Sequence, residues 1–297
     1  MRFLDPRNDV AFKKIFGSED HKDITISFLN SILGYTGDQV IVDVQFMNTE
    51  QHPMLKEKKE NILDIMCTDQ KGYKYIVEMQ VEQVKEFGKR MVYYGAKTYA
   101  LQLGRAAPYY KLSPVIVIAI VDFIMFPKKK NYVSIHKILD DVTYENDLQQ
   151  LTFAFVELKK FKKIESELRT AQDKWIYFIK EISTQDHIPI LLANEEFEEA
   201  CHLALRGTWN EDELSEYDDA FVRATDAQTS VELAIEKGIA MGMEKGVEKG
   251  IQKGLEKGIQ KGLEDTALKM LAEGFSMDIV VRVTGLSIDQ IKALQKK

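Results

Sequence analysis

Three side chains on two short β-rich runs could do chemistry together: Asp64, Glu78 and Gln80. The runs, 62–68 and 73–81, flank a polar turn that ends in glycine, which predicts a β-hairpin. Because successive side chains of a strand point to opposite faces, Glu78 and Gln80 share one face. One register of the hairpin places Asp64 opposite Glu78, with their Cβ atoms roughly 5 Å apart.

Two carboxylates facing each other repel unless a positive charge lies between them. Mg²⁺ suits the position of Asp64 and Glu78, since it prefers oxygen ligands and is commonly held by one or two carboxylates, water and substrate phosphate. Gln80 would add a neutral amide near the same ion or its attacking water. The alternative is that both acids lie on the solvated face of a half-exposed hairpin.

The sequence around these residues also resembles a known family. Asp64 followed by Glu78-Met79-Gln80 resembles the D…ExK signature of PD-(D/E)XK nucleases, in the variant with Gln in place of Lys. The opening segment 6–17, PRNDVAFKKIFG, is similar to the start of the recombination-promoting nuclease (Rpn) family, whose members are often labelled transposases. The resemblance covers most of the chain.

This resemblance implies an α/β fold, a restriction-endonuclease-like PD-(D/E)XK core with a mixed central sheet flanked by helices. It implies a DNA endonuclease that needs Mg²⁺ or Mn²⁺, with Asp64 and Glu78 as metal ligands and catalytic residues and Gln80 as the third catalytic position. It also links the chain to DNA recombination and transposition, or to defence against mobile elements and phage. Without the motif lysine the site lacks a cation near the nucleophile, so a weak or inactive nuclease-like DNA-binding protein that self-assembles is the alternative.

The resemblance further implies an acid on the helix before the first strand, and Asp9 fits that position. Residues 9–17 read as a short helix that ends at a glycine, and 21–33 as a second amphipathic helix. Asp9 could equally complement the dipole of its own helix, because an acid in the first turn is favourable there.

The segment 82–103 is predicted to be a long helix. Arg90, Tyr94 and Lys97 are spaced so that they share one side of it. In related nucleases this helix lends polar residues to the site, so the resemblance makes these three candidates for DNA or phosphate binding, with Arg90 contacting phosphate through its forked donors. The alternative is a surface arginine beside a tyrosine of the core.

Further strands are predicted at 40–47, 114–122 and 151–158. The second, PVIVIAIVD, is nearly continuous in aliphatic residues, which indicates a central strand covered on both faces. Residues 164–224 have the character of helices. Together these elements predict a nuclease-like domain over 1–225.

The charge distribution and the absence of several enzyme motifs limit the classes of function that the sequence allows. The 297-residue chain carries a net charge of −7, yet 71–135 holds eleven Lys and Arg against four Asp and Glu. This is typical of an acidic protein with one phosphate-facing surface. Motifs of P-loop enzymes (GxxxxGK(S/T)), zinc peptidases (HExxH), CxxC proteins and serine hydrolases (GxSxG) are absent, and no small-molecule cofactor is expected.

The sequence also predicts where the protein works. Its longest apolar run, 114–126, is too short to cross a bilayer, the N-terminus lacks a signal-peptide core, and no membrane partner is expected. Cys67 and Cys201 are isolated, as expected for reduced thiols in the cytoplasm.

Residues 226–266 contain a four-residue repeat that predicts a glycine-containing helix. An apolar residue recurs every fourth position from Ile235 to Leu263, and all but the first follow a glycine. Since this period exceeds 3.6, the apolar stripe winds around the helix and favours a right-handed path against a partner. We expect self-association through this helix; a flexible helical spacer is the alternative.

Residues 267–297 resemble a small helix-turn-helix cap. Ser276 and Ser287 are candidate N-caps, and Gly274 and Gly285 candidate helix stops. Such a pair of helices either reads DNA through a groove-binding helix or docks on the repeat. Rpn-type chains commonly end in such a repeat and cap, and the resemblance implies a part in assembly and regulation.

Overall fold

The computed structural model describes residues 2–47, 63–104, 107–193 and 195–295. Internal contacts divide the chain into two compact units, Met1–Thr225 and Asp226–Lys297. Each unit is described by itself below.

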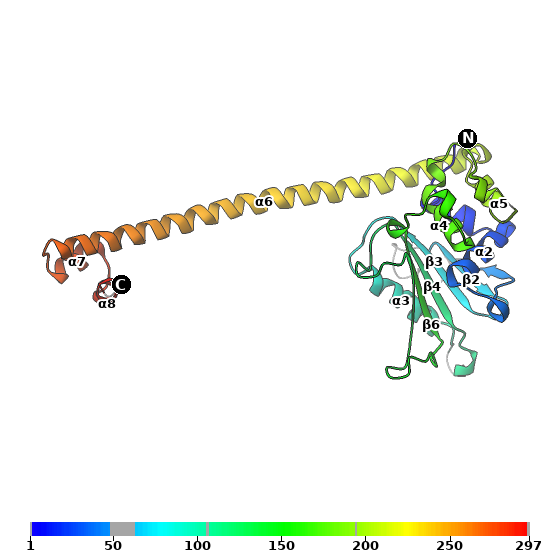
Figure 1. Cartoon of the computed structure of the whole chain (residues 1–297), viewed down its shortest axis with the longest axis horizontal. Helices are drawn as coiled ribbons and strands as arrows, with labels where there is room; N and C mark the ends of the chain where they lie inside the picture. The colour runs from blue at the N-terminus through cyan, green and yellow to red at the C-terminus, as the bar shows by residue number, and fades with distance from the viewer. Residues whose placement is uncertain (1, 48–62, 105–106, 194, 296–297) are drawn as a thin grey trace. The chain divides into compact units, whose positions relative to one another are not determined.

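A six-stranded mixed sheet forms the centre of the N-terminal unit, with strand order β1-β2-β3-β4-β6-β5 (Figure 1). Strands β3, β4 and β6 run parallel, and the other neighbours pair antiparallel. The strands are β1 Val44–Phe46, β2 Ile65–Asp69, β3 Lys74–Gln80, β4 Val115–Val121, β5 Val133–Lys137 and β6 Leu151–Glu157. The predicted α/β architecture with a mixed central sheet is therefore confirmed.

Strand β4 is buried along its whole length, as its aliphatic sequence predicts. Its side chains alternate between two hydrophobic layers: Ile116, Ile118 and Ile120 join one, and Val117 and Ala119 the other. A strand that is apolar on both faces must be covered on both, which sets the three-layer arrangement.

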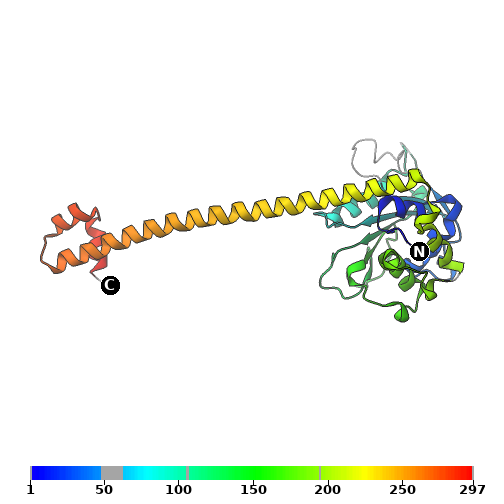
Figure 2. The same cartoon turned by 90° about the horizontal axis from the view of Figure 1, so that it is seen from above.

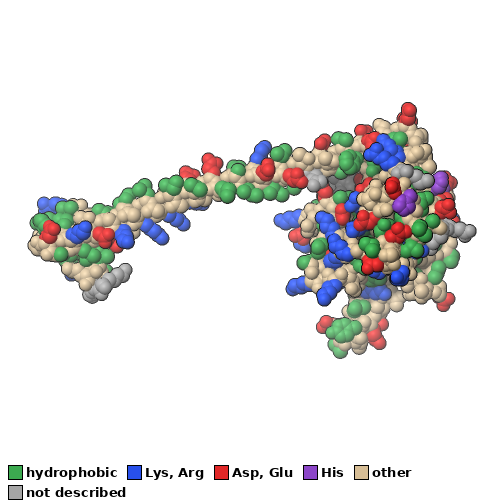
Figure 3. Space-filling model, turned by 45° about the horizontal axis from the view of Figure 1, so that its top comes forward, with side chains coloured by type: hydrophobic (Ala, Val, Ile, Leu, Met, Phe, Trp, Pro, Cys, Tyr) green, Lys and Arg blue, Asp and Glu red, His purple; other side chains and the backbone are tan. Residues whose placement is uncertain are grey.

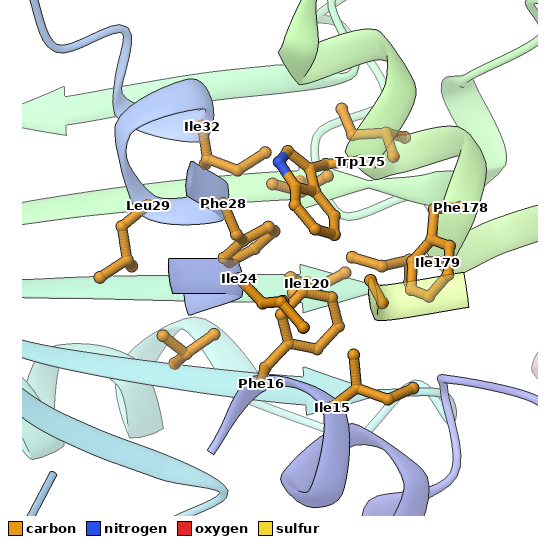
Figure 4. Packing of buried hydrophobic residues seen from close by; sticks show 14 of the residues in the cluster. Ile15, Phe16, Ile24, Phe28, Leu29, Ile32, Ile120, Trp175, Phe178 and Ile179 are labelled. Carbon is orange, nitrogen blue, oxygen red and sulfur yellow. The ribbon is translucent and has the colours of Figure 1, made fainter. Parts of the chain in front are cut away.

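Four helices belong to the larger hydrophobic layer: α1 Asp9–Phe16, α2 Lys22–Leu33, α4 Ala171–Glu181 and α5 Glu195–Leu203. Aromatic rings fill the space between them. Figure 4 shows Phe16 and Phe28 beside Trp175, and the ring centroids of Phe16 and Trp175 lie 5.6 Å apart. The buried aromatic face of α4 thus packs against α1 and α2 and holds them on the sheet.

Helix α3, Phe87–Ala100, lies on the other face. Gly95 allows it to lie close to the sheet, because a Cβ at this position would be only 3.1 Å from side-chain carbons of both Val117 and Phe153. The close approach brings the N-terminal half of α3 over the carboxyl-terminal end of β3.

Several elements differ from the sequence-based expectation. β1 is shorter than the predicted strand 40–47, and α3 begins at Phe87 because Glu86 has a left-handed backbone conformation, with φ of 62°. β5 was not predicted. The start of the first predicted hairpin run, at residue 62, lies outside the described residues.

The C-terminal part of the chain is helical. Helix α6, Glu211–Ala272, begins within the first unit and continues through the repeat, followed by α7 Met277–Thr284 and α8 Ile288–Leu294. The last turns of α6 lie beside both short helices (Figure 1, Figure 2), and Ala267, Val280 and Ile291 are fully buried where they meet. The expected pair of short capping helices is thus present.

The apolar residues of the repeat are exposed along α6, and Figure 3 shows hydrophobic side chains along this helix. Seven of them have exposed fractions from 56% to 71%: Ile235, Ile239, Met243, Val247, Ile251, Leu255 and Ile259. We call these seven residues the repeat stripe. Among the described residues, no helix is long and apolar enough to span a membrane.

Candidate active site

Asp64 and Glu78 lie side by side at one end of the β2–β3 hairpin. Ile65 pairs with Val77, so the same register continued by one residue brings Asp64 opposite Glu78. Asp64 lies at a bend just before β2, and its Oδ2 accepts a hydrogen bond of 2.7 Å from the backbone N–H of Met79. The bend and this bond direct the Asp64 carboxylate toward the end of β3.

Glu78 and Gln80 project toward helix α3, on the same face of β3 as the buried Ile76. Arg90 of α3 reaches both: one terminal nitrogen is 3.2 Å from Glu78 Oε1 and 2.5 Å from Gln80 Oε1. The Arg90 guanidinium also lies 4.8 Å from the centre of the Phe87 ring. Arg90 therefore joins the acid and the amide of the motif through one group.

Helix α1 approaches from the opposite layer. Lys13 Nζ lies 3.8 Å from Asp64 Oδ1, and the Lys13 side chain is 37% exposed. Asp9, one turn earlier on α1, is exposed and close enough to act electrostatically on both Asp64 and Glu78. The two acids of the hairpin are thus flanked by Lys13 on one side of the sheet and Arg90 on the other.

Burial makes both acids harder to ionise. Burial raises the pKa of Asp64 to about 7, opposed by the Met79 N–H and supported by the negative charge of Asp9. Burial, and then the charge of Asp64, raises the pKa of Glu78 to about 8, while Arg90 acts in the opposite direction. Two carboxyl groups whose ionised forms are disfavoured by burial and by each other mark this place as a candidate functional site.

The oxygen atoms available here suit a hard divalent cation. Glu78 Oε2 is buried and has no hydrogen-bond partner among the described residues. No cluster of three or more His, Cys, Asp or Glu that could hold a metal occurs in the described part of the chain. Two carboxylates that leave coordination positions for water and phosphate match how Mg²⁺ is usually bound, so the residues present fit such an ion.

Comparison with known proteins shows the family of the chain. The family model described as PD-(D/E)XK nuclease family transposase matches residues 6–234, most of the chain. The chain belongs to this PD-(D/E)XK family. A second family model, described as the C-terminal HTH domain of the Rpn/YhgA-like nuclease family, matches residues 266–296. The resemblance to Rpn nucleases is thereby confirmed. No curated protein and no solved structure gave a significant match.

Most of the site residues expected from sequence meet in this PD-(D/E)XK chain. Asp64, Glu78, Gln80 and Arg90 are in contact or adjacent, and Asp9 lies near them. Tyr94 stands one turn after Arg90, and its buried hydroxyl has no hydrogen-bond partner among the described residues. The fold thus gathers these side chains from α1, the hairpin and α3 at one end of β3.

Lys97 is not part of this group of contacts. Its Nζ lies 5.5 Å from the centre of the Tyr93 ring, on a partly exposed part of α3. The seven-residue spacing from Arg90 indicated a shared side of the helix, but the described contacts of Arg90 are to Glu78, Gln80 and Phe87.

Sequence reasoning missed Lys13. The residue lies on the helix that was expected to carry the extra acid, four positions after Asp9, a spacing that places both on one helix face. That spacing was the available signal. The spacing alone does not show that the fold brings Lys13 beside Asp64.

Proposed function

We propose that this chain is a divalent-metal-dependent DNA endonuclease that hydrolyses phosphodiester bonds. The observation that supports it best is the pair Asp64 and Glu78, opposed on adjacent strands, with raised carboxyl pKa values and a buried Glu78 oxygen that lacks a hydrogen-bond partner among the described residues. The family to which the chain belongs consists of nucleases by its description. The proposal takes the metal to be Mg²⁺ or Mn²⁺.

In this proposal Asp64 and Glu78 hold the cation. A bound divalent ion would lower the pKa of a water ligand and offset negative charge on the phosphate. The Met79 N–H keeps Asp64 oriented, and Arg90 keeps Glu78 and Gln80 together through hydrogen bonds. Gln80 orients water with its amide, while Arg90 and Tyr94 support the site from α3.

The surface that would face DNA follows from the parallel strands. Because β3, β4 and β6 are parallel, their carboxyl ends meet at one edge of the sheet, where Glu78 and Gln80 lie. The segments after β4 and β6 carry exposed lysines at this edge: Lys128, Lys129, Lys130, Lys159 and Lys162. Lys160 joins the two segments by donating to the Phe126 carbonyl.

Neutralising phosphate charge is the main source of sequence-independent DNA affinity. A basic edge beside two acids therefore suits a nuclease whose net charge is negative overall. We infer that this edge, which we call the lysine edge and define by the five exposed lysines above, binds the DNA backbone. Because the family description names transposases, we connect the activity with DNA transposition. A part in DNA recombination, or in defence against mobile elements and phage, is a further proposal that comes from the sequence resemblance to Rpn nucleases.

We further propose that the repeat stripe binds the same stripe of a second copy. An exposed apolar row of seven residues is unusual on a protein that stays monomeric. Around the helix the repeat forms four rows. The apolar row is flanked by a Glu/Gln row on one side and by a glycine row on the other, and a Lys row lies opposite the apolar row. A second copy offers both an apolar row to bury the stripe and a glycine row that makes room for close approach. This arrangement also fits the alternative function, a weak or inactive DNA-binding protein that assembles through its repeat.

Plasmid cleavage tests the proposed function directly. We would compare the natural chain with Asp64→Asn and Glu78→Gln in Mg²⁺ or Mn²⁺, all purified identically. We expect metal-dependent nicking by the natural chain and a loss of at least about 10²-fold in each variant, because each removes a charged oxygen ligand. Glu82→Gln, a carboxylate two residues beyond Gln80, is the matched control and should cleave normally. Equal cleavage by all four proteins would identify a contaminant, and no cleavage by any would favour the non-catalytic alternative.

A further inference from the structure

The third position of the catalytic motif is a glutamine here, so the motif itself supplies no positive charge. Two cations nevertheless reach the pair of acids: Lys13 from α1 and Arg90 from α3. The two are not equivalent in geometry. Their differences indicate which of them can act on a substrate.

Arg90 is committed to the protein. The nitrogen that bonds Glu78 also bonds Gln80, and the guanidinium is held over the ring of Phe87. Its side chain is 22% exposed, and its Nε is buried without a partner among the described residues. A guanidinium fixed in this way positions Glu78 and Gln80 rather than meeting an incoming phosphate.

Lys13 is placed differently. At 3.8 Å from Asp64 Oδ1, its ammonium is near enough for electrostatic attraction but too far for a hydrogen bond. This contact therefore leaves its N–H donors to other groups. The Lys13 side chain is more exposed than that of Arg90, so it is the more accessible of the two to a substrate.

The backbone of Lys13 is well anchored. Its neighbours Phe12, Ile15 and Phe16 are fully buried, and α1 begins at a capping asparagine, Asn8, whose Oδ1 accepts the Val10 N–H at 2.9 Å. At the other end, Gly17 donates to the Lys13 carbonyl at 2.8 Å. A side chain at Gly17 would begin 2.7 Å from that carbonyl oxygen and 3.5 Å from Ile65. Close packing of α1 against β2 thus sets where Lys13 meets Asp64.

We propose that Lys13 is a catalytic residue that takes over the function of the lysine missing from the motif. The proposal rests on the endonuclease function proposed above. Lys13 donates hydrogen bonds to the attacking water or to a non-bridging oxygen of the scissile phosphate and stabilises the negative charge that develops there. A bond forms from the water oxygen to phosphorus while the bond from phosphorus to the leaving sugar oxygen breaks. The water gives its proton to solvent, the sugar oxygen takes one from solvent, and Lys13 gains and loses none.

The experiment compares Lys13→Met, Lys14→Met and the double variant Lys13→Met with Gln80→Lys in the full chain. Lys14 is the matched control, since it lies next to Lys13 on α1 but pairs with Glu213 and lies over the Trp209 ring. Three quantities are measured for each protein: plasmid cleavage, Mn²⁺ affinity by calorimetry without DNA, and the melting temperature.

We expect Lys13→Met to lose at least about 10²-fold in cleavage while keeping its melting temperature and its Mn²⁺ affinity. Affinity should be kept because loss of a nearby positive charge does not weaken the binding of a cation by carboxylates. Lys14→Met should cleave normally. The double variant should cleave at least about tenfold faster than Lys13→Met alone, since Gln80→Lys restores an ammonium group to the motif position.

Cleavage by Lys13→Met within about threefold of the natural chain would overturn the proposal. An equal loss of cleavage in Lys14→Met would also overturn it. A loss of Mn²⁺ affinity in Lys13→Met that parallels its loss of cleavage would do the same, because either result indicates an effect through structure. If Gln80→Lys does not restore cleavage to the Lys13 variant, Lys13 does not have the function of the motif lysine. Absence of cleavage by the natural chain itself would instead reject the nuclease function.

Discussion

At the scale of single residues, the surroundings of Glu78 act in opposite directions on its ionisation. Burial and the neighbouring Asp64 disfavour its charge, whereas Arg90 favours it. One of its oxygens bonds Arg90 and the other has no hydrogen-bond partner among the described residues. A buried, ionised carboxylate with one unpaired oxygen lowers the free energy of unfolding, and a bound cation would stabilise it.

This cost predicts a dependence of stability on pH in the metal-free protein. The pKa of Glu78 is raised from 4.5 to about 8, so between these pH values the folded state holds more protons than the unfolded state. The free energy of unfolding must therefore fall as pH rises through this range. Glu78→Gln removes this titration. Between pH 5 and 8.5 we expect the natural chain to lose roughly 4 kcal/mol more than the variant.

Urea unfolding in EDTA at several pH values measures this difference, with Glu82→Gln as the control that should follow the natural chain. Identical pH dependence of the natural chain and Glu78→Gln would show that Glu78 ionises as freely in the folded state as in the unfolded state. Added Mn²⁺ should stabilise the natural chain more at pH 8.5 than at pH 5, because metal ligands must be deprotonated.

At the scale of elements, the acids and the cations come from different parts of the fold. Asp64 and Glu78 belong to one hairpin, and Lys13 and Arg90 come from helices in opposite layers. The lysine edge is formed by the segments that follow β4 and β6. Thus the ends of the strands position the acids and the lysine edge, while α1 and α3 place a cation on either side of the acids.

The lysine edge predicts the salt dependence of DNA binding. Lys128→Ala with Lys130→Ala should weaken duplex binding and reduce the slope of log affinity against log salt by about 2, roughly one for each phosphate that is no longer neutralised. Fluorescence anisotropy in EDTA measures binding without cleavage. The control pair is Lys71→Ala with Lys111→Ala, exposed lysines that precede β3 and β4 and so lie at the opposite end of the parallel strands. An equal change in both pairs would mean that binding responds to total charge and not to this edge.

The sequence allowed prediction of elements with a strong pattern. The aliphatic run of β4 and the spacing around the hairpin turn indicated a central strand and the opposition of Asp64 and Glu78, and the structure has both. Strand β5 was missed because VSIHK at Val133–Lys137 is short and half polar, and it forms only as an edge partner of β6. The contact of Lys13 with Asp64 depends on packing between distant segments, which no local pattern records.

At the scale of the whole molecule, the repeat has consequences for how two copies would pair. In a parallel pair the Glu/Gln row of one helix meets the glycine row of the other, by analogy with the flanking positions of coiled coils. In an antiparallel pair the Glu/Gln rows would meet each other and place like charges together. We therefore expect a parallel arrangement with a right-handed path.

Single cysteines test both association and direction. Ile239→Cys lies on the apolar row near one end of the repeat stripe, so it should form a disulfide between copies only if they pair in parallel. Lys245→Cys lies on the opposite row and should not crosslink. The native Cys67 and Cys201 do not compete, because burial raises the pKa of each thiol to about 12. Non-reducing gels give the result, and a lack of dimer in Ile239→Cys would reject parallel pairing.

The position of β3 inside the sheet also bears on how the protein is made. The side chains of the candidate site, from Lys13 to Arg90, are synthesised before β4 and β6, the strands that turn β3 from an edge strand into a central one. Domains fold as units once enough of the chain has left the ribosome. A growing or prematurely ended chain that stops before Val115 holds every reactive group yet lacks the strands that support them. If the chain is the nuclease proposed above, we therefore expect chains that stop before Val115 to be inactive on DNA.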